Sequence, residues 1–207
     1  MEFCIFDCEM TAWEGSSARG WSNEGEEPEI IRIVALRINI EDGKVTKAAP
    51  VFDEYIKPSV NPVLSDYITK LTGIEQIHVK HADDFKTVAL KFNDYAKGAM
   101  LLSFGGDDIT MNYNSKLYGI EADMPVFVGK NLRPWFTTCG VDLTQVVNGE
   151  TLTSGSVAKV VGVKDFESHP HQGQDDVLSL FHAMKKLIEE DGHKFPPVKQ
   201  AAKRDVA

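Results

Sequence analysis

The start of the chain constrains its fold most strongly. Residues 3–6 are all apolar, and they lead directly into Asp7 and Glu9, which stand two residues apart. Because side chains alternate between the two faces of a β-strand, Asp7 and Glu9 point to the same face, and the run before them is apolar on both faces. A strand that is apolar on both faces is typical of the middle of a sheet. The sequence therefore predicts a central strand that ends in two carboxylates on one side.

This pair of carboxylates indicates a metal site. Acids that project together from a buried strand repel each other and lose hydration, a combination that is rarely retained without a cation between them. The competing interpretation is a strand end whose two acids are solvated. We expect a site for a hard metal ion, completed by ligands from other parts of the chain.

Length and charge restrict the class of protein. With 207 residues, the chain is long enough for one domain with a well-buried core, and its composition is that of an ordinary globular protein. The net charge of −9, from 22 Lys+Arg and 31 Asp+Glu, argues against a protein that coats long nucleic acids through a broad basic surface. It does not argue against an enzyme that grips a strand end with the help of divalent cations.

The expected compartment is the cytoplasm. No apolar run approaches the roughly 20 residues that a membrane helix needs, and the N-terminus lacks the pattern of a signal peptide. We therefore expect no membrane association. Cys4 and Cys8 belong to the first strand, so we interpret them as small buried hydrophobes and not as a disulfide pair or a zinc clip.

Periodicity predicts the order of strands and helices. Alternating and β-branched residues predict strands over 29–38, at about 46–57, over 99–104 and around 126–128, and helical spacing predicts short helical pieces within 63–79 and helices over 83–97, from about 107 and over about 173–190. Asp42-Gly43 is a hairpin signal, so we expect the first three strands to form an antiparallel meander. Residues 132–162 are expected to form helices and loops.

These elements predict an α/β fold in which helices flank a mixed five-stranded sheet, with the later strands parallel. The domain is expected to span residues 1–192, followed by a polar, poorly ordered tail over 193–207. Sites in such sheets gather at the carboxyl ends of strands. The acids after the first strand and those at Asp107 and Asp108, after the strand at 99–104, both fit that rule.

A third group of polar residues precedes the last helix. Asp176 shares a stripe of that helix with Leu180, Ala183 and Leu187, so its carboxylate borders the buried face. His171 lies five residues earlier, on the loop ahead of the helix, where it can reach a bound substrate. The competing interpretation of His171 is an ordinary surface residue.

Together, the three groups match the needs of two-metal phosphoryl chemistry: Asp7 and Glu9, one of Asp107 or Asp108, and Asp176 as oxygen ligands. Oxygen ligands suit Mg²⁺ or Mn²⁺. One ion activates a water molecule, the second stabilises the leaving 3′ oxygen, and a neutral histidine accepts the proton of the water.

The same segments resemble the three motifs of the DEDDh 3′–5′ exonucleases, a family with an RNase H-like fold. Phe6-Asp7-Cys8-Glu9 matches the first motif, Asp108 matches the second, and His171 and Asp176, with four residues between them, match the third. The resemblance covers roughly residues 2–190, with further similar segments at 29–33 and 71–74, and is closest to the Eri1-like and KinA-pathway-inhibitor-like branch.

The resemblance implies a metal-dependent 3′–5′ exonuclease that releases nucleoside 5′-monophosphates from the 3′ ends of single-stranded RNA or DNA. It implies that Asp7, Glu9, Asp108 and Asp176 hold two Mg²⁺ ions, for which Mn²⁺ substitutes, and that His171 is the general base.

It further implies that Met10 and Thr11 line the pocket for the terminal nucleotide and that Leu71 and Thr72 contact its base. Both pairs have a second interpretation as core or helix residues. The alternative for the whole chain is a catalytically silent module on the same fold that binds nucleic acid or regulates another protein. Magnesium-dependent release of mononucleotides from a labelled oligonucleotide discriminates between the two classes.

Overall fold

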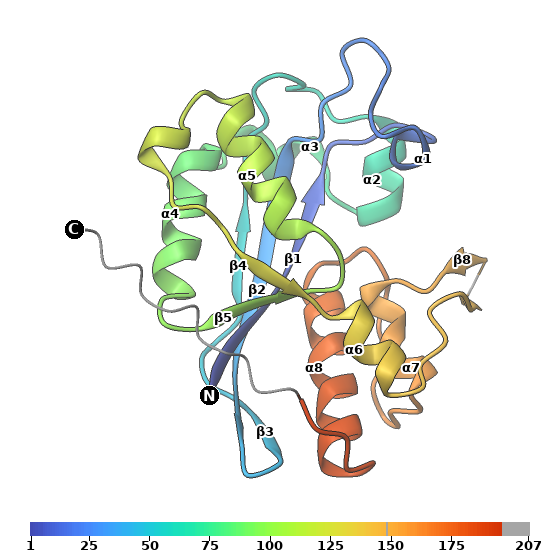
Figure 1. Ribbon diagram of the computed structural model, residues 1–207. Helices are drawn as coiled ribbons and strands as arrows, with labels where there is room; N and C mark the ends of the chain where they lie inside the picture. The colour runs from blue at the N-terminus through green and yellow to red at the C-terminus, as the bar shows by residue number, and fades with distance from the viewer. Residues whose placement is uncertain (148, 196–207) are drawn as a thin grey trace.

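The computed structural model describes residues 1–147 and 149–195, and its centre is a mixed sheet with helices on both faces (Figure 1). The strands of this sheet are β1 (Glu2–Met10), β2 (Ile30–Glu41), β3 (Lys44–Lys47), β4 (Phe52–Tyr55), β5 (Met100–Ser103) and β6 (Gly129–Asn131). Their order is β3-β2-β1-β5-β6, with β4 also paired to β2. β1 therefore lies in the middle of the sheet, as its two apolar faces predict.

The antiparallel meander at the start of the chain is confirmed. β2 pairs antiparallel with β1 and with β3, and Asp42 and Gly43 turn between β2 and β3 with φ angles of 49° and 73°, as a tight hairpin turn requires. The predicted third strand at 46–57 is instead two strands, β3 and β4, which pair with opposite ends of β2. The interruption at residues 48–51 contains Pro50, which has no N–H group for a strand ladder.

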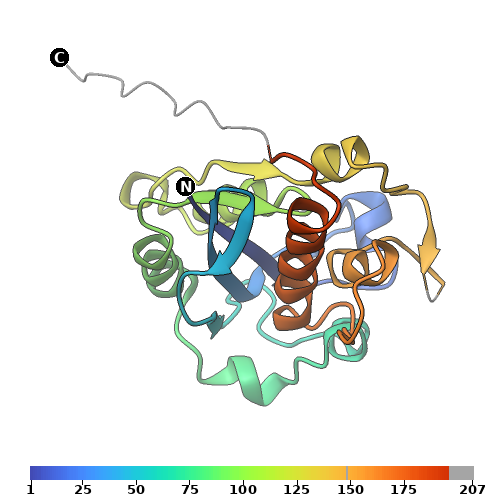
Figure 2. The same ribbon diagram turned by 90° about the horizontal axis from the view of Figure 1, so that it is seen from below.

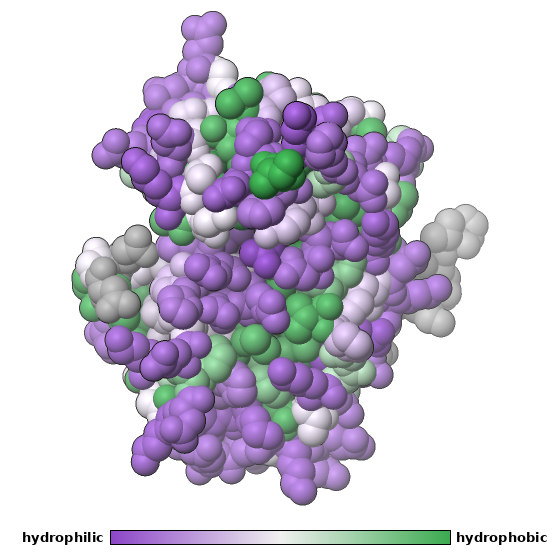
Figure 3. All heavy atoms as spheres, turned by 180° about the vertical axis from the view of Figure 1, so that it is seen from behind, coloured by the Kyte–Doolittle hydropathy of each residue, from purple (hydrophilic) through white to green (hydrophobic). Residues whose placement is uncertain are grey.

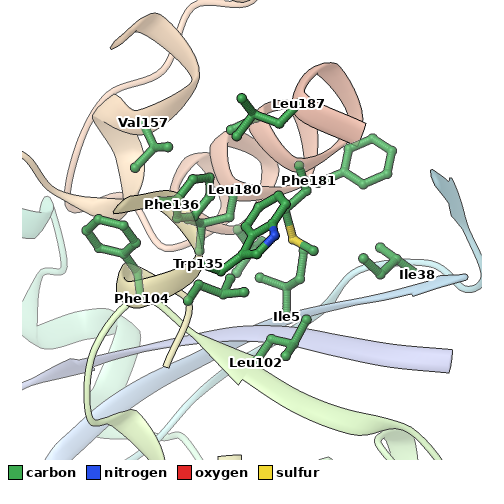
Figure 4. Close-up of a cluster of buried hydrophobic side chains, with 14 of the residues drawn as sticks. Ile5, Ile38, Leu102, Phe104, Trp135, Phe136, Val157, Leu180, Phe181 and Leu187 are labelled. Carbon is green, nitrogen blue, oxygen red and sulfur yellow. The ribbon is translucent and has the colours of Figure 1, made fainter. Parts of the chain in front are cut away.

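One face of the sheet is covered by α8 (Gln174–Glu189). Phe3 and Ile5 from β1 lie in the same buried cluster as Leu180 and Leu187 from α8. Figure 4 shows Ile5, Leu180 and Leu187 between the strands and the helix. Figure 2 shows α8 running along this face. The predicted stripe of α8 is thus buried, and Asp176 at the start of that stripe is carried to the sheet.

The other face is covered by α4 (Phe85–Tyr95) and α5 (Asp107–Leu117). Phe6 of β1 packs on Phe92 of α4 with a distance of 5.2 Å between ring centroids. Asn114 of α5 is fully buried, and its amide ties the helix to the start of β2: Oδ1 accepts a hydrogen bond from Ile30 N (2.9 Å) and Nδ2 donates to Pro28 O (2.9 Å). This bond fixes the position of α5 relative to the strands that carry the acids.

Shorter helices complete the fold: α1 (Ser16–Arg19), α2 (Asp66–Thr72), α3 (Gln76–Lys80), η1 (Glu121–Asp123), α6 (Arg133–Thr138), η2 (Ser154–Ser156) and α7 (Val157–Val160). α2 and α3 pack over the end of β1 through a third buried cluster that includes Ala12, Ile31 and Ile68. The buried carboxylate of Glu29 anchors the segment before α2, because it accepts hydrogen bonds from the backbone N–H groups of residues 59–61.

The strand expected around 126–128 lies three residues later, as β6 over Gly129–Asn131. Phe127 is buried in the cluster under α4, whereas Val126 and Val128 are 79% and 74% exposed. The valines suggested a strand through their β-propensity, but the backbone pairs with β5 only from Gly129 onward.

Two features of the C-terminal part were not predicted. A small hairpin of β7 (Val146–Val147) and β8 (Glu150–Thr151) lies within the segment expected to hold only helices and loops. The expected tail does not begin at residue 193, since Phe195 packs edge-on against Phe3 and Trp135. The rest of the predicted tail, residues 196–207, lies outside the described residues.

In the part of the chain that the structure describes, no helix is both long enough and apolar enough to cross a membrane. The surface seen from behind is mainly hydrophilic, with small apolar patches (Figure 3).

Candidate active site

Asp7 and Glu9 lie on the face of β1 that α8 covers. They continue the row of Phe3 and Ile5, and Asp7 stands opposite Val34 of β2 in the strand register. The register shifts between Glu9 and Met10, so the regular ladder ends where the acids end. Because β1 is buried on both faces, its position is fixed. Both carboxylates are thus held on the face that α8 covers, near the start of that helix.

Asp176 enters from the first turn of α8 and meets these acids. Ligand oxygens of Asp7, Glu9 and Asp176 all lie within 4.8 Å of one another. Asp176 is 2% exposed, and its Oδ1 accepts a hydrogen bond from Ser154 Oγ at 2.7 Å. Its Oδ2 is buried and has no hydrogen-bond partner among the described residues. A buried carboxylate oxygen without a hydrogen-bond partner, on a residue close to two other acids, is compatible with a cation site.

Two glycines allow this close approach. A Cβ at Gly155 would lie 2.8 Å from Asp176 Oδ1 and 2.7 Å from Pro170 Cα. A Cβ at Gly173, whose φ is +35°, would lie 2.7 Å from Val34 Cγ2. Any larger residue at Gly155 would push η2 away from Asp176 and Pro170, and one at Gly173 would push the start of α8 away from β2.

Burial and mutual repulsion raise the pKa values of the acids. For Asp7 the pKa is raised by burial and then by the charges of Asp176 and Asp107. For Glu9 burial and the charge of Asp176 raise the pKa to about 8. Burial also raises the pKa of Asp176, against the opposing hydrogen bond from Ser154. The cluster therefore favours a bound positive charge, either protons or a metal ion.

Arg32 supplies a fixed positive charge beside the cluster. It stands opposite Glu9 in the register, and its charge acts to lower the pKa of Glu9. Its guanidinium is held on the far side by Asp53, with Nε–Oδ1 and Nη2–Oδ2 distances of 2.8 and 2.7 Å, and lies 5.1 Å from the centroid of the Tyr55 ring. This paired geometry orients the arginine as a rigid group.

The fourth acid differs from the sequence prediction. Asp108 does not face the cluster, because its Oδ2 accepts a hydrogen bond from Gly129 N at 2.9 Å and so points to β6. Asp107 faces β1 instead: its Oδ1 accepts a hydrogen bond from Cys8 N at 3.2 Å, and its charge raises the pKa of Asp7. Successive residues of a helix point about 100° apart, so only one of the two acids can face β1. The structure brings Asp107, and not Asp108, to the side of Asp7.

His171 lies on the loop before α8, as expected, with a left-handed backbone at φ 66°. Its charge acts on the pKa of Asp176, and it lines a cavity of 320 Å³ together with Leu71 and Ser156. His169 is engaged elsewhere, since its Nδ1 lies 3.1 Å from Asp175 Oδ2. Of the two histidines, His171 is the one whose charge acts on Asp176 and that lines the cavity next to Leu71.

The four residues expected to hold the terminal nucleotide divide into two kinds. Thr11 is 2% exposed, and its hydroxyl donates to Glu27 O (2.5 Å) and accepts from Glu29 N (2.9 Å). Thr72 is 4% exposed, and its hydroxyl bonds to the backbone of its own helix end. Both threonine side chains therefore serve the fold. Met10 and Leu71 are only partly buried, and Leu71 lines the cavity beside His171.

The donor set fits a hard divalent cation. All candidate ligand atoms are carboxylate oxygens, three of them converge, and one buried oxygen of Asp176 is unpaired in the described structure. Mg²⁺ and Mn²⁺ prefer such oxygen ligands, whereas zinc sites usually include cysteine or histidine nitrogen.

Comparison with known proteins identifies the family. The family model described as "Exonuclease" (RNase_T) matches residues 4–180, so the chain belongs to this exonuclease family. The resemblance to DEDDh exonucleases and the RNase H-like fold predicted from the sequence are thereby confirmed.

Individual relatives with similar sequences are also named as exonucleases. The chain is 26% identical to human "3'-5' exoribonuclease 1" over 197 residues, which cover 90% of this chain and 52% of the human protein. It is 35% identical to the Drosophila melanogaster "3'-5' exonuclease Snipper" over 94 residues, covering 45% of this chain and 31% of that one. The chain thus matches about a third to a half of the length of these curated relatives.

Solved structures are similar over nearly the whole chain. The nuclease domain of 3'hExo, "a DEDDh family member, bound to rAMP", aligns with a TM-score of 0.67 and 26% identity, and the alignment covers 92% of both chains. Cell-death related nuclease 4 (CRN-4) aligns with a TM-score of 0.71 at 22% identity, over 90% of this chain and 63% of that one, and supports the fold.

Sequence reasoning missed three contributors to the site. Ser154 and Gly155 lie in a segment with no periodic pattern, and only the folded chain brings them to Asp176. Arg32 lies within a predicted strand, and its pairing with Asp53 depends on the register between β2 and β4. The sequence contains no local signal for either contact.

We predict that the acid cluster makes the metal-free protein less stable as the pH rises. Unfolded carboxyls ionise near about pH 4, whereas burial raises the pKa of Glu9 to about 8 and that of Asp107 to about 6. Since the folded state keeps these protons to higher pH, the contribution of the cluster is fully present below the unfolded pKa and is lost as the pH rises through the folded pKa values. Urea unfolding without metal between about pH 5 and 8 should show this fall, which Glu9→Gln should weaken. A rise of the unfolding free energy that Glu9→Gln leaves unchanged would contradict it.

A second prediction separates Asp107 from Asp108. Asp107→Asn removes a charge that acts on Asp7, so it should weaken Mn²⁺ binding about tenfold or more, the usual effect of losing a group that supports a metal site. Asp108→Asn keeps an oxygen that can still accept from Gly129 N and should weaken binding much less. Calorimetric Mn²⁺ titration of the two variants and the parent measures this. If Asp108→Asn weakens Mn²⁺ binding more than Asp107→Asn does, Asp108 is the acid of the metal site, as the sequence motif implies.

Proposed function

We propose that this chain is a metal-dependent 3′–5′ exonuclease that releases nucleoside 5′-monophosphates from the 3′ ends of single-stranded nucleic acid. The observation that carries the proposal is the convergence of Asp7, Glu9 and Asp176 within 4.8 Å, beside a cavity lined by His171. Membership of the exonuclease family and the similarity to 3'-5' exoribonuclease 1 support the same reaction.

The proposed cofactor is a pair of Mg²⁺ ions, which Mn²⁺ can replace. Asp7, Glu9 and Asp176 would hold them, with Asp107 adding negative charge from the side of α5. Bound in this way, divalent cations supply the charge that activates a water molecule and stabilises the leaving 3′ oxygen.

We assign the other roles in the proposed reaction to side chains of the protein. His171 would accept the proton of the attacking water, since its charge acts on Asp176, it lines the neighbouring cavity, and its loop is joined to α8. Ser154 donates a hydrogen bond to one oxygen of Asp176 and leaves the other without a hydrogen-bond partner among the described residues. Arg32, held by Asp53, contributes a nearby positive charge that acts to lower the pKa of Glu9.

The terminal nucleotide would be bound beside Leu71 and Met10. Leu71 lines the cavity next to His171 and offers an apolar surface to a base. The similar 3'hExo structure is described as bound to rAMP, a mononucleotide of the kind that such a reaction releases. The hydroxyls of Thr11 and Thr72 are held by backbone groups, so any contribution of these residues to binding comes from their backbone or methyl groups.

The alternative of a catalytically silent binding module is weaker on physical grounds. A module that only binds nucleic acid gains nothing from three buried acids that repel one another, since they destabilise the fold and repel phosphates.

The direct test compares three substrates with the same sequence in the presence of Mg²⁺: a linear single strand, the same strand with a 3′-phosphate, and a closed circle. We expect mononucleotides from the linear strand, slow release from the phosphorylated strand, and no cleavage of the circle. Removal of metal with a chelator should abolish release, and a chelator-resistant activity would refute the metal requirement. Cleavage of the circle would identify an endonuclease and overturn the proposal.

His171→Ala tests the proposed base. We expect kcat to fall by roughly 10²–10⁴, the range for a positioned acid–base group, while Mn²⁺ affinity stays close to that of the parent. His81→Ala is a matched control, because His81 is exposed at the end of α3, away from the acids. A His171→Ala variant with parental kcat would exclude this histidine as the base.

A further inference from the structure

Two neighbouring cavities form one groove beside the acid cluster. The first, of 320 Å³, is the one lined by Leu71 and His171. The second, of 360 Å³, shares three lining residues with the first, Val147, Ser156 and Pro170. Because they share these lining residues, the two cavities adjoin each other, and we refer to them together as the groove. Each has the size of a small-ligand site, so the groove has room for more than one nucleotide.

The groove leads away from the catalytic residues. Its near end lies between α2 and the loop that carries His171, and its far end lies between α7 and the loop at residues 166–170. Phe166 lines the far end and is itself held from behind, since its ring packs 4.6 Å from the ring centroid of His182. A partly exposed aromatic ring at this position is a surface on which a base can stack.

The groove also carries unpaired positive charge. Lys70 lines the near end and Lys159 the far end, and both lysines are exposed. Neither forms an ion pair within residues 1–147 and 149–195. Glu167 is the acid among the lining residues of the far cavity. On a chain with a net charge of −9, two unpaired lysines along one groove offer a local attraction for phosphates.

Another cavity of the protein is also lined by two lysines, but these lysines form ion pairs. It is lined by Lys185 and Lys186 on α8, but Lys185 Nζ lies 3.3 Å from Glu189 and Lys186 Nζ lies 2.9 Å from Asp191. Those lysines are neutralised by acids of the same chain. Lys70 and Lys159 are left for a ligand.

One wall of the groove is fixed by its own hydrogen bonds. Ser168 Oγ donates to Gly155 O, and His169 N donates to Asp175 Oδ2 at 2.8 Å. Gly155 packs so closely on Pro170 that a Cβ would lie 2.7 Å from Pro170 Cα. Gly155, which approaches Asp176 closely, therefore also packs against the wall of the groove.

We propose that this groove binds the nucleotides that precede the terminal nucleotide of an extended single strand, with Lys70 and Lys159 contacting successive phosphates and Phe166 stacking on a base. The inference rests on the proposed function, because it assigns the near end of the groove to the 3′ end of the substrate. It predicts that the enzyme prefers strands of several nucleotides to dinucleotides, which cannot reach Lys159.

The test compares Lys159→Gln with the matched control Lys116→Gln, which removes one exposed lysine from α5 outside the groove. For each variant, kcat/KM is measured with a dodecamer and with a dinucleotide. We expect Lys159→Gln to lower the ratio of dodecamer to dinucleotide kcat/KM about threefold to tenfold, through KM, and to weaken the salt dependence of dodecamer binding by somewhat less than one unit of log–log slope, as expected for one lost phosphate contact. Lys116→Gln should keep the parental ratio.

Binding measured without turnover separates the two proposals. Fluorescence anisotropy of a labelled dodecamer in Ca²⁺ reports the groove even if the chain hydrolyses nothing. If turnover is absent but Lys159→Gln weakens dodecamer binding and Lys116→Gln does not, the proposed function fails and the groove stands. If the parent is active and both variants bind and cleave the dodecamer alike, the groove is refuted and the proposed function stands. Absence of dodecamer binding by the parent refutes the groove.

Discussion

The repulsion between buried acids is the constraint on which the rest of the structure depends. Asp7, Glu9 and Asp176 have no energetic reason to meet, because burial raises the pKa of all three and the charge of Asp176 further raises those of Asp7 and Glu9. They meet because each is attached to an element that is fixed by apolar packing: β1 by cores on both faces, and α8 by a buried stripe that starts at Asp176. The hydrophobic cores thus supply the free energy that holds the charges together, and the charges in turn create an attraction for metal ions.

The parts of this site that could be predicted from the sequence are those governed by regular periodicity. The alternation along β1 places Asp7 and Glu9 on one face, and the helical stripe of α8 places Asp176 on the sheet. The choice between Asp107 and Asp108 could not be settled in this way, because it depends on where α5 begins and how Asn114 orients it. A shift of one residue at a helix start changes which neighbour faces the strand.

Other differences between the sequence prediction and the structure occur where the same residue type suits two structural roles. Thr11 and Thr72 carry hydroxyls that suit a nucleotide pocket, but the same hydroxyls satisfy backbone groups at a strand end and a helix end. The edge strand expected at 46–57 is broken at the segment containing Pro50. In both cases local composition was compatible with two outcomes, and the backbone hydrogen-bond requirement decided between them.

The pairing of Arg32 with Asp53 has a consequence for the availability of the metal site. An arginine opposite Glu9 is the natural internal competitor for a divalent cation, since a swing of its guanidinium toward the acids would neutralise them without any ligand. The bidentate bond to Asp53 and the Tyr55 ring hold the guanidinium back, with 13% of the side chain exposed. Asp53, on the edge of the sheet, thereby protects the acids from occupation by the protein's own charge.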